Sequence, residues 1–303
     1  MSRGLGDVYK RQFVSPKGVD NIRIGQDSWE RAFVKILNPL GEDTSVMRTV
    51  LTPEMLEVLG RNYSRNIEAV RAFELGNTFM ANLMDDNELP VESDAMSIGF
   101  YGKDEDFFTL KGVIVEMMAK LGIKDLEFIP EKEYGTYHPG RCARIVTRKA
   151  CATQGGQEEE TVELGIMGEV HPDVAEKYGI GMRCYTAELF FNVVTEMADL
   201  EKVYTPLPKY PATSRDIALV VEEDMAVGDI EKVIKEAGGK LLREIRLFDV
   251  YRGPQVGENK KSVAFALTYR HDDRTLTDDD VNKVHNKILD DLREKLDIVL
   301  RDI

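Results

Sequence analysis

The sequence predicts an α+β protein whose strands are joined mainly by hairpins and therefore form antiparallel sheets. Strand patterns with alternating residue types recur along the chain, for example at 71–80 and 141–148. Apolar residues at helical spacing mark the segment 106–121 as an amphipathic helix. A segment with two prolines, 203–210, reads as a linker that divides the chain in two. The 303 residues are long enough for two domains, each with its own core.

Composition narrows the class of protein. With 43% apolar residues, 31% charged residues and a net charge of −14, the chain is typical of a globular protein and unlike a general nucleic-acid or membrane binder. The sequence has no secretory leader and no long apolar span, so we expect a cytoplasmic location. The three cysteines, at 142, 151 and 184, lack the paired spacing of a zinc site, so we expect free thiols and no metal.

Residues 1–12 show no helical or strand period, and we expect a non-native tail there. The first domain is expected over 13–202. Its predicted helices are one capped by Ser28 that carries Ala32, Phe33, Ile36 and Leu37, one from Thr52 to about Asn66 with Pro53 in its first turn, one over 106–121 ended by Gly122, and a short one at 171–179. Its predicted strands are 71–80, 96–102, 141–148, 165–170 and 184–194, with 152–160 as a hairpin tip.

The second domain, 211–303, has a more compact pattern. Its expected elements are a strand at 216–221, a helix at 227–237, a hairpin within 247–270, a helix at 278–296 and a last strand at 297–302. Thr277 and Asp280 form a capping box at the start of the second helix. The order β-α-β-β-α-β predicts the ferredoxin-like split fold, which has both helices on one side of a four-stranded sheet. The other side of that sheet is expected to stay open.

The two faces of the predicted hairpin differ clearly in residue type, and this difference points to a function. Alternation puts Val263, Phe265, Leu267 and Tyr269 on one face of the second strand and Ser262, Ala264, Ala266 and Thr268 on the other. In the first strand Phe248 and Val250 share the core face, whereas Asp249 and Tyr251 point the opposite way. A small, flat surface beside one tyrosine and one carboxylate leaves room for a planar guest such as a base. The alternative is an ordinary edge hairpin.

Charge singles out the same region. The segment 240–270 contains seven Lys and Arg residues but only three acidic residues, so it is a basic segment of an acidic chain. Those available for phosphate contacts are Lys240, Arg243, Arg246, Arg252, Lys260 and Lys261, although they serve solubility equally well.

Long phrases of the sequence resemble the C-terminal part of the β subunit of bacterial phenylalanyl-tRNA synthetases. LNPLGEDTSVMRTVLTPEMLEVLGRN, RAFELGNTF, HPGRCARI and GIMGEVHPDVAEKYGI are similar to that subunit's class II synthetase-like core. KYPATSRDIALVV, LFDVYRG, KKSVAFALTYR and RTLTDDDV are similar to its ferredoxin-fold anticodon-binding domain. The resemblance therefore implies a class II synthetase-like antiparallel sheet domain followed by a ferredoxin-like βαββαβ domain.

The resemblance also implies a task. In this family two α and two β subunits attach phenylalanine to its tRNA with ATP and Mg²⁺, and the active site lies in α. The fragment would hold no cofactor and no catalytic residue. It would bind α through 106–121 or 53–66, and bind the tRNA anticodon. Matched position by position, the residues implied at the anticodon are Asp249, Tyr251, Ser262 and Arg301, with Tyr251 as the stacking platform. Arg215, just before the first strand, is a candidate for contact with a tRNA phosphate, and a structural salt bridge is the alternative.

Two other functions stay open at this stage. Ferredoxin-like domains also bind small regulatory molecules, which would call for a Gly-rich turn after the first strand; the sequence there has only Gly228. A hydrolase would need His138 or His171, but no phosphate loop, H-E-x-x-H or G-x-S-x-G motif accompanies them. His285 reads as a half-buried packing residue, and His271 lies in a loop that can approach RNA.

Overall fold

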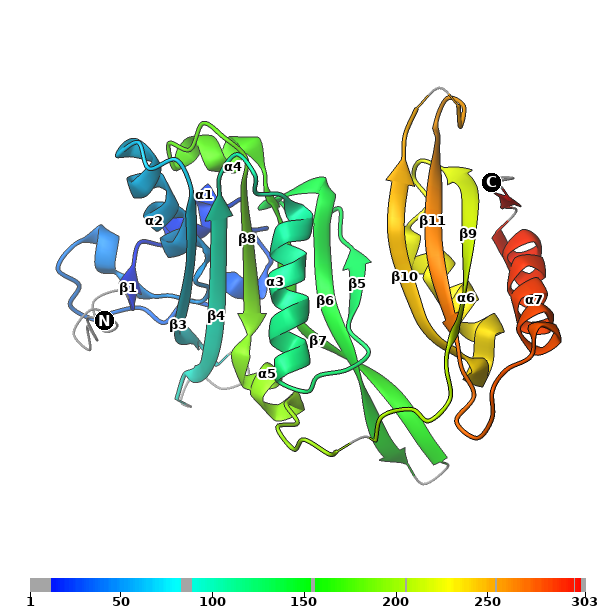
Figure 1. The fold of residues 1–303 in the computed structure, drawn as a ribbon. Helices are drawn as coiled ribbons and strands as arrows, with labels where there is room; N and C mark the ends of the chain where they lie inside the picture. The colour runs from blue at the N-terminus through cyan, green and yellow to red at the C-terminus, as the bar shows by residue number, and fades with distance from the viewer. Residues whose placement is uncertain are drawn as a thin grey trace. The chain divides into compact units, whose positions relative to one another are not determined.

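The computed structural model divides the chain into two compact units, with the boundary in the sequence between Lys202 and Val203 (Figure 1). The structure describes residues 12–82, 89–153, 156–204, 206–253, 255–296 and 298–300. The first eleven residues of the expected tail lie outside this range, as does Arg301. None of the helices in the described part of the chain is long and apolar enough to cross a membrane.

The first unit is built on a six-stranded antiparallel sheet in the order β3-β4-β8-β7-β6-β5. Its strands are β3 (Val70–Met80), β4 (Val91–Tyr101), β5 (Glu127–Pro130), β6 (Tyr137–Thr153), β7 (Gly156–Val170) and β8 (Cys184–Phe190). A second, two-stranded sheet consists of β1 (Phe13–Val14) and β2 (Val46–Met47). The predicted antiparallel α+β class is therefore confirmed.

Helices pack on both faces of this sheet. Helix α3 (Phe107–Lys120) buries Leu110, Ile114 and Met118 against one face, together with Ile98 and Phe100 of β4. The other face receives α1 (Lys17–Asn21), α2 (Thr52–Ser64) and α4 (Pro172–Lys177). Figure 1 shows α3 running along the sheet, with β3 at the sheet's edge. The helix ends as predicted, because Gly122 adopts φ +75°, where a side chain would be strained.

Two predicted elements of the first unit are wrong. Ser28 begins only the 3₁₀ turn Trp29–Arg31, without a side-chain cap, and the chain after it is extended: Ile36 N donates to Ser45 O at 2.9 Å. Pairing with a distant segment accounts for this, because Lys35 forms an antiparallel bridge with Val46 and Met47 N donates to Val34 O at 2.9 Å. The strand expected over 184–194 ends at Phe190, and its last residues belong to α5 (Phe191–Met197). Short apolar runs do not distinguish a strand from a buried helix.

Two further differences concern the strands: one is longer than expected, and one was not predicted. The expected hairpin tip at 152–160 is mostly strand, because β6 and β7 stay paired as far as Thr153 and Gly156. Strand β5 at the other edge was not predicted at all, since its four residues end at Pro130 and show no clear alternation.

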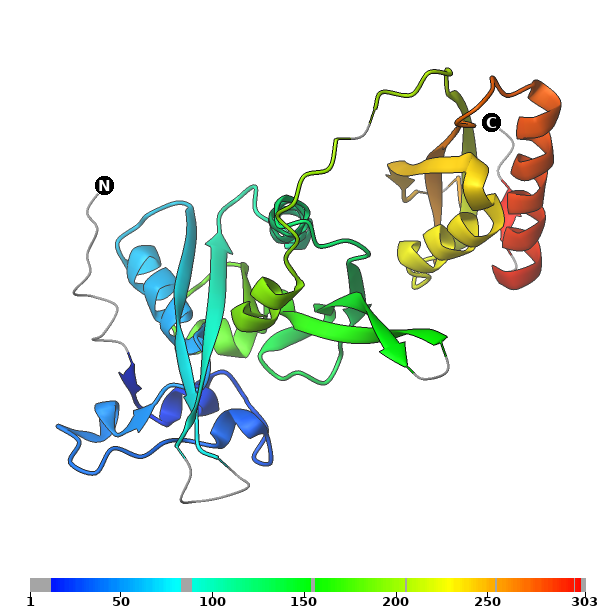
Figure 2. The same cartoon turned by 90° about the horizontal axis from the view of Figure 1, so that it is seen from below.

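The second unit has the predicted ferredoxin-like topology. Its elements are β9 (Thr213–Glu222), α6 (Val227–Gly238), a 3₁₀ turn (Gly239–Leu241), β10 (Leu242–Tyr251), β11 (Lys260–Tyr269), α7 (Asp278–Leu296) and β12 (Val299–Leu300). The antiparallel sheet has the order β10-β11-β9-β12, so the first and third strands are central. Both helices share one hydrophobic core with Leu219, Phe265 and Leu267 and so cover the same face of the sheet (Figure 2).

Candidate nucleic-acid interface

The face of this sheet that points away from α6 and α7 is called the open face here. Strand register assigns it Glu244, Arg246, Asp249 and Tyr251 from β10, Ser262, Ala264, Ala266 and Thr268 from β11, and Ser214, Asp216, Ala218 and Val220 from β9. Its central column is small, whereas the β10 column carries long polar and aromatic side chains. A shallow surface with one tall wall follows from these residue types.

Three of the residues implied by the resemblance lie together on this face. Tyr251 is directly opposite Ser262 in the register, and Asp249 is opposite Ala264 in the next pair on this face. Each such row of opposed residues across the strands is called a rung here. Asp249 is exposed and Tyr251 is partly buried, whereas Ser262 is only 5% exposed. The tyrosine and the carboxylate therefore stand beside a floor formed by the serine and alanine.

Gly253 leaves the space that the Tyr251 ring occupies. A Cβ atom at residue 253 would lie 2.4 Å from the Tyr251 hydroxyl oxygen and 2.6 Å from Cζ. The ring thus leans along its own strand toward the hairpin loop, over a residue without a side chain. Any larger residue at 253 would have to displace it.

A β-bulge in β10 changes the faces that simple alternation assigns. Leu247 is opposite Phe265 and Asp249 is opposite Ala264, so Phe248 is an extra residue without its own partner. Val250 packs on the core as predicted, but Phe248 does not share its burial: it is 49% exposed and absent from the core contacts. The core position predicted for Phe248 is therefore wrong.

The other two implied residues are not part of this group. Arg215 is opposite Leu267, on the helix side of the sheet, and its Nη2 donates to Asp278 Oδ1 at 2.9 Å. This contact is the structural salt bridge that the sequence left open as an alternative. Arg301 lies outside the described residues.

Most of the basic residues in this region already have partners. Lys261 is buried, and its Nζ donates to the carbonyl oxygens of Glu223 and Met225 at 2.8 and 2.7 Å, which fastens the turn before α6. Burial lowers the pKa of Lys261. Ion pairs engage three more, Arg243 with Asp272, Arg252 with Glu223 and Lys260 with Glu222. Arg246, which lies on the open face, makes no hydrogen bond or ion pair with the described residues.

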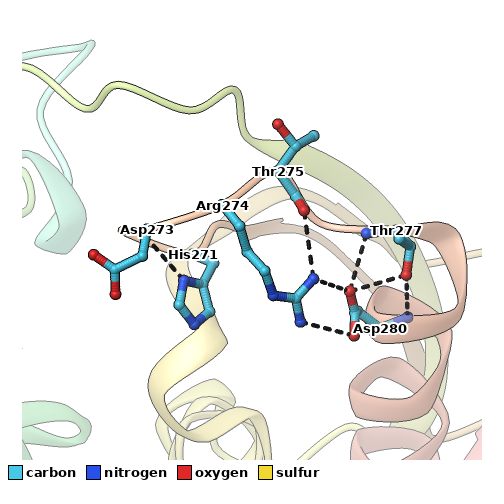
Figure 3. Close-up of polar contacts among 6 residues, drawn as sticks. All are labelled: His271, Asp273, Arg274, Thr275, Thr277 and Asp280. Carbon is cyan, nitrogen blue, oxygen red and sulfur yellow. Dashed lines mark hydrogen bonds and ion pairs between the residues drawn. The ribbon is translucent and has the colours of Figure 1, made fainter.

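The loop between β11 and α7 is tied down by its own side chains (Figure 3). Arg274 forms two bonds to the Asp280 carboxylate, at 2.5 and 3.0 Å. Thr277 N donates to Asp280 Oδ2 at 3.1 Å and Asp280 N donates to Thr277 Oγ1 at 3.3 Å, so the predicted capping box is confirmed. Hydrogen bonding to Arg274 holds the pKa of Asp280 well below its usual range. His271 Nδ1 accepts from Asp273 N at 3.0 Å.

The two histidines considered for catalysis serve the backbone. His138 Nδ1 accepts from Gly140 N at 3.1 Å, and His171 Nδ1 accepts from Asp173 N at 3.2 Å as the N-cap of α4. Within the described residues, no group of three or more His, Cys, Asp or Glu side chains is arranged to hold a metal ion. Gly228, the glycine considered for a small-molecule site, lies in the first turn of α6.

Lowering the pH should destabilise the second unit through His285. Its Nδ1 lies 3.1 Å from the Tyr269 hydroxyl, and burial, followed by the nearby Arg215 charge, lowers its pKa below the usual 6.5. The folded state thus favours neutral His285, and this contribution is lost as the pH falls from about 6.5, the pKa in the unfolded chain, toward the lower pKa in the folded chain. Because the ring is partly exposed, we expect under ~1 kcal/mol. Denaturant unfolding of the wild type and His285→Gln at pH 7.5 and 5.5 measures it; an equal pH dependence in both proteins would contradict the assignment.

The polar groups on the α2 side of the first sheet are also committed to structure. Glu188, on β8, accepts from Leu51 N and Thr52 N at 2.9 Å each and from Thr52 Oγ1 at 2.5 Å, so it caps α2 from across the fold. Burial raises the pKa of Glu188 and raises that of Glu54 to about 8. Arg48 Nη1 donates to Glu74 Oε1 at 2.7 Å.

Comparison with known proteins gives the same division of the chain. Residues 1–191 match the family described as "Phenylalanyl tRNA synthetase beta chain CLM domain", and 208–301 match the "Ferredoxin-fold anticodon binding domain". Relatives named phenylalanine–tRNA ligase beta subunit include those of Clostridium tetani (44% identical, 98% of this chain and 36% of the relative) and Clostridium acetobutylicum (43%, 99% and 36%). The Bacillus subtilis protein of that name is 35% identical over 87% of this chain and 32% of its own length.

The chain spans about a third of the length of these relatives, so it corresponds to one part of such a subunit. The antiparallel-sheet unit and the ferredoxin-like unit occur in the order in which the two family matches follow each other. The chain therefore belongs to the phenylalanyl-tRNA synthetase β-chain family.

Proposed function

We propose that this chain is the part of a phenylalanine–tRNA ligase β subunit that binds the tRNA anticodon and supports the catalytic α subunit. The ligase attaches phenylalanine to its tRNA using ATP. The observation that carries the proposal is the open face, where Tyr251, Asp249 and Ser262 stand together in a unit that matches anticodon-binding domains. Residues 203–210 then act as the linker between the two functions, with Val203, Tyr204 and Leu207 exposed.

The chemistry of the open face suits a single unstacked base. Tyr251 supplies an aromatic platform, and stacking on such a ring contributes roughly 1–3 kcal/mol whatever the base. To distinguish one base from another, the protein needs hydrogen bonds to the base edge. The Asp249 carboxylate can accept hydrogen bonds, and the Watson–Crick edge of guanine offers two N–H donors. Phenylalanine codons end in a pyrimidine, so a guanine at the first anticodon position fits this acceptor. Ser262, small and nearly buried, leaves room for the base.

For the first unit we propose a supporting role without chemistry of its own. Glu188 is held by the N-terminus of α2, and Arg48 is paired with Glu74 inside the fold, so neither is available to a nucleotide. ATP and Mg²⁺ would accordingly bind the α subunit, in the assembly of two α and two β subunits that the family resemblance implies.

A titration of the full chain tests the anticodon proposal. The ligand is the anticodon stem-loop of phenylalanine tRNA, and the control is the same stem-loop with its first anticodon base changed from guanine to cytosine. We expect tighter binding of the guanine loop at every salt concentration, because phosphate contacts alone do not distinguish the two loops. Equal affinity for both would refute base recognition by this chain.

The α subunit is proposed to meet the α3 side of the edge strand β3. Phe73 and Leu75 are 67% and 48% exposed there, in register with Ile98 and Met96 of β4, and Phe108 of α3 is exposed on the same side. Large apolar side chains that are exposed together at a sheet edge normally mark a contact with a partner. Helix α3 was one of the two candidates from the sequence.

Phe73→Asp should therefore weaken assembly with α by at least tenfold, since it puts a charge into an apolar contact. Co-purification of the variant with co-expressed α, followed by sedimentation, measures the loss. Leu200→Asp, an exposed leucine after α5, is the matched control and should assemble normally. Unchanged assembly of the Phe73 variant would move the α contact elsewhere.

A further inference from the structure

The bulge at Phe248 brings a cation onto the same face as Asp249. Residues 246 and 249 are three apart, so strict alternation would put their side chains on opposite faces of β10. The extra residue cancels that offset: Arg246 is opposite Ala266 and Asp249 is opposite Ala264, both of which belong to the open face. Ile245, by contrast, packs on the core.

Across the sheet from Arg246, the same rung ends in an acid. Ala266 is opposite Asp216 of β9, so the rung reads Arg246, Ala266, Asp216. Its two outer strands are about 10 Å apart, twice the usual strand spacing. Ala266 between them is 7% exposed and forms a flat floor, whereas Arg246 and Asp216 are both exposed. Among described residues, no hydrogen bond or ion pair occupies either charge.

This rung lies next to the one that carries Asp249. Neighbouring rungs of one face are about 7 Å apart along a strand, a length that one extended nucleotide can span. A strand of RNA whose first base is hydrogen-bonded to Asp249 would thus reach the Arg246 rung with its next base. The floor is continuous between the two positions, because Ala264 and Ala266 are neighbours on that face.

We propose that Arg246 and Asp216, on either side of Ala266, form a second base subsite that reads the middle anticodon base. The proposal rests on the proposed anticodon-binding function. Phenylalanine codons have uracil in the middle, so the base to be read is adenine. Adenine presents an amino donor next to ring-nitrogen acceptors. The Asp216 carboxylate accepts from the amino group, and the Arg246 guanidinium donates to a ring nitrogen. Uracil would turn a carbonyl oxygen toward Asp216 instead.

The test compares three stem-loops on the full chain: the phenylalanine anticodon loop, a loop with the middle adenine changed to uracil, and a loop with the first guanine changed to cytosine. For the wild type we expect about a tenfold preference for adenine in the middle, the usual size of one charge-assisted hydrogen bond. Asp216→Asn should lose most of this preference, because an amide accepts from adenine and donates to uracil alike. Arg246→Gln should reduce it, and both variants should keep the first-base preference.

Lys240→Gln is the matched control, since it removes one positive charge in the turn before β10 without touching the open face. It should lower affinity for all three loops equally. If Arg246→Gln lowers the affinity for all three loops equally and Asp216→Asn raises it equally, the two residues act only through phosphates or overall charge, and the base subsite is overturned. A preserved adenine preference in both variants overturns it as well. In either case an intact first-base preference leaves the anticodon function standing; loss of that preference in the wild type refutes the function itself.

Discussion

Replacing Tyr251 with alanine should weaken binding of the phenylalanine anticodon stem-loop by roughly ten- to a hundredfold, the value of one base stacked on an aromatic ring. The ring leans over Gly253, so its removal takes away the platform without opening the core of the unit. The loss should be nearly the same for stem-loops that differ in the first base, since stacking tolerates any base. Fluorescence anisotropy with the full chain measures it at two salt concentrations.

Two variants separate stacking from other effects of the Tyr251 change. Tyr251→Phe keeps the ring and should retain most of the affinity. Tyr204→Ala removes an equally large aromatic residue that is 83% exposed in the segment before β9, and should bind as the wild type does. If Tyr251→Ala binds within twofold of wild type, the tyrosine is not the platform.

Glu188→Ala should cost about 3 kcal/mol or more of the free energy of unfolding of the first unit. The change leaves two buried backbone N–H groups, at Leu51 and Thr52, without an acceptor, and each such group costs about 1–3 kcal/mol. Helix α2 has no side-chain cap of its own, so nothing in its first turn replaces the carboxylate. Denaturant unfolding, followed through the amide exchange of α2, gives the loss and its location.

The matched controls are Glu188→Gln and Glu176→Ala. Glutamine keeps one acceptor oxygen and should recover part of the loss, whereas Glu176 is exposed on α4 and its removal should be neutral. An α2 that exchanges at the wild-type rate in Glu188→Ala would show that the bond across the fold does not hold the helix.

Local rules predicted the elements whose signals are local. Helix α7 begins and ends at the predicted residues because Thr277 and Asp280 cap it and its apolar stripe runs to Leu296. The βαββαβ order followed from five short patterns in sequence, and the fold has that topology. Asp249 and Tyr251 were placed correctly on one face, since both lie after the bulge, where alternation is undisturbed.

What could not be predicted depends on contacts between distant residues. The acceptor for the α2 amides is 136 residues away from Thr52, and no local pattern marks it. Phe248 was predicted to be a core residue, because nothing in the sequence distinguishes a strand with a bulge from a regular strand. Lys261 looked like a free cation, yet two carbonyl oxygens of the neighbouring turn bind it inside the fold.

The extra residue in β10 also affects how relatives should be compared. A gap of one position between Arg246 and Asp249 would ordinarily be dismissed as a trivial length difference. Here it would exchange the inner and outer residues of the first half of the strand, burying Arg246 and Glu244 while exposing Ile245. A homologue without this extra residue would need different residues in the first half of the strand to place the same side chains on the open face. Relatives should therefore be compared at this strand by the face on which each side chain lies, and not by position in a sequence alignment alone.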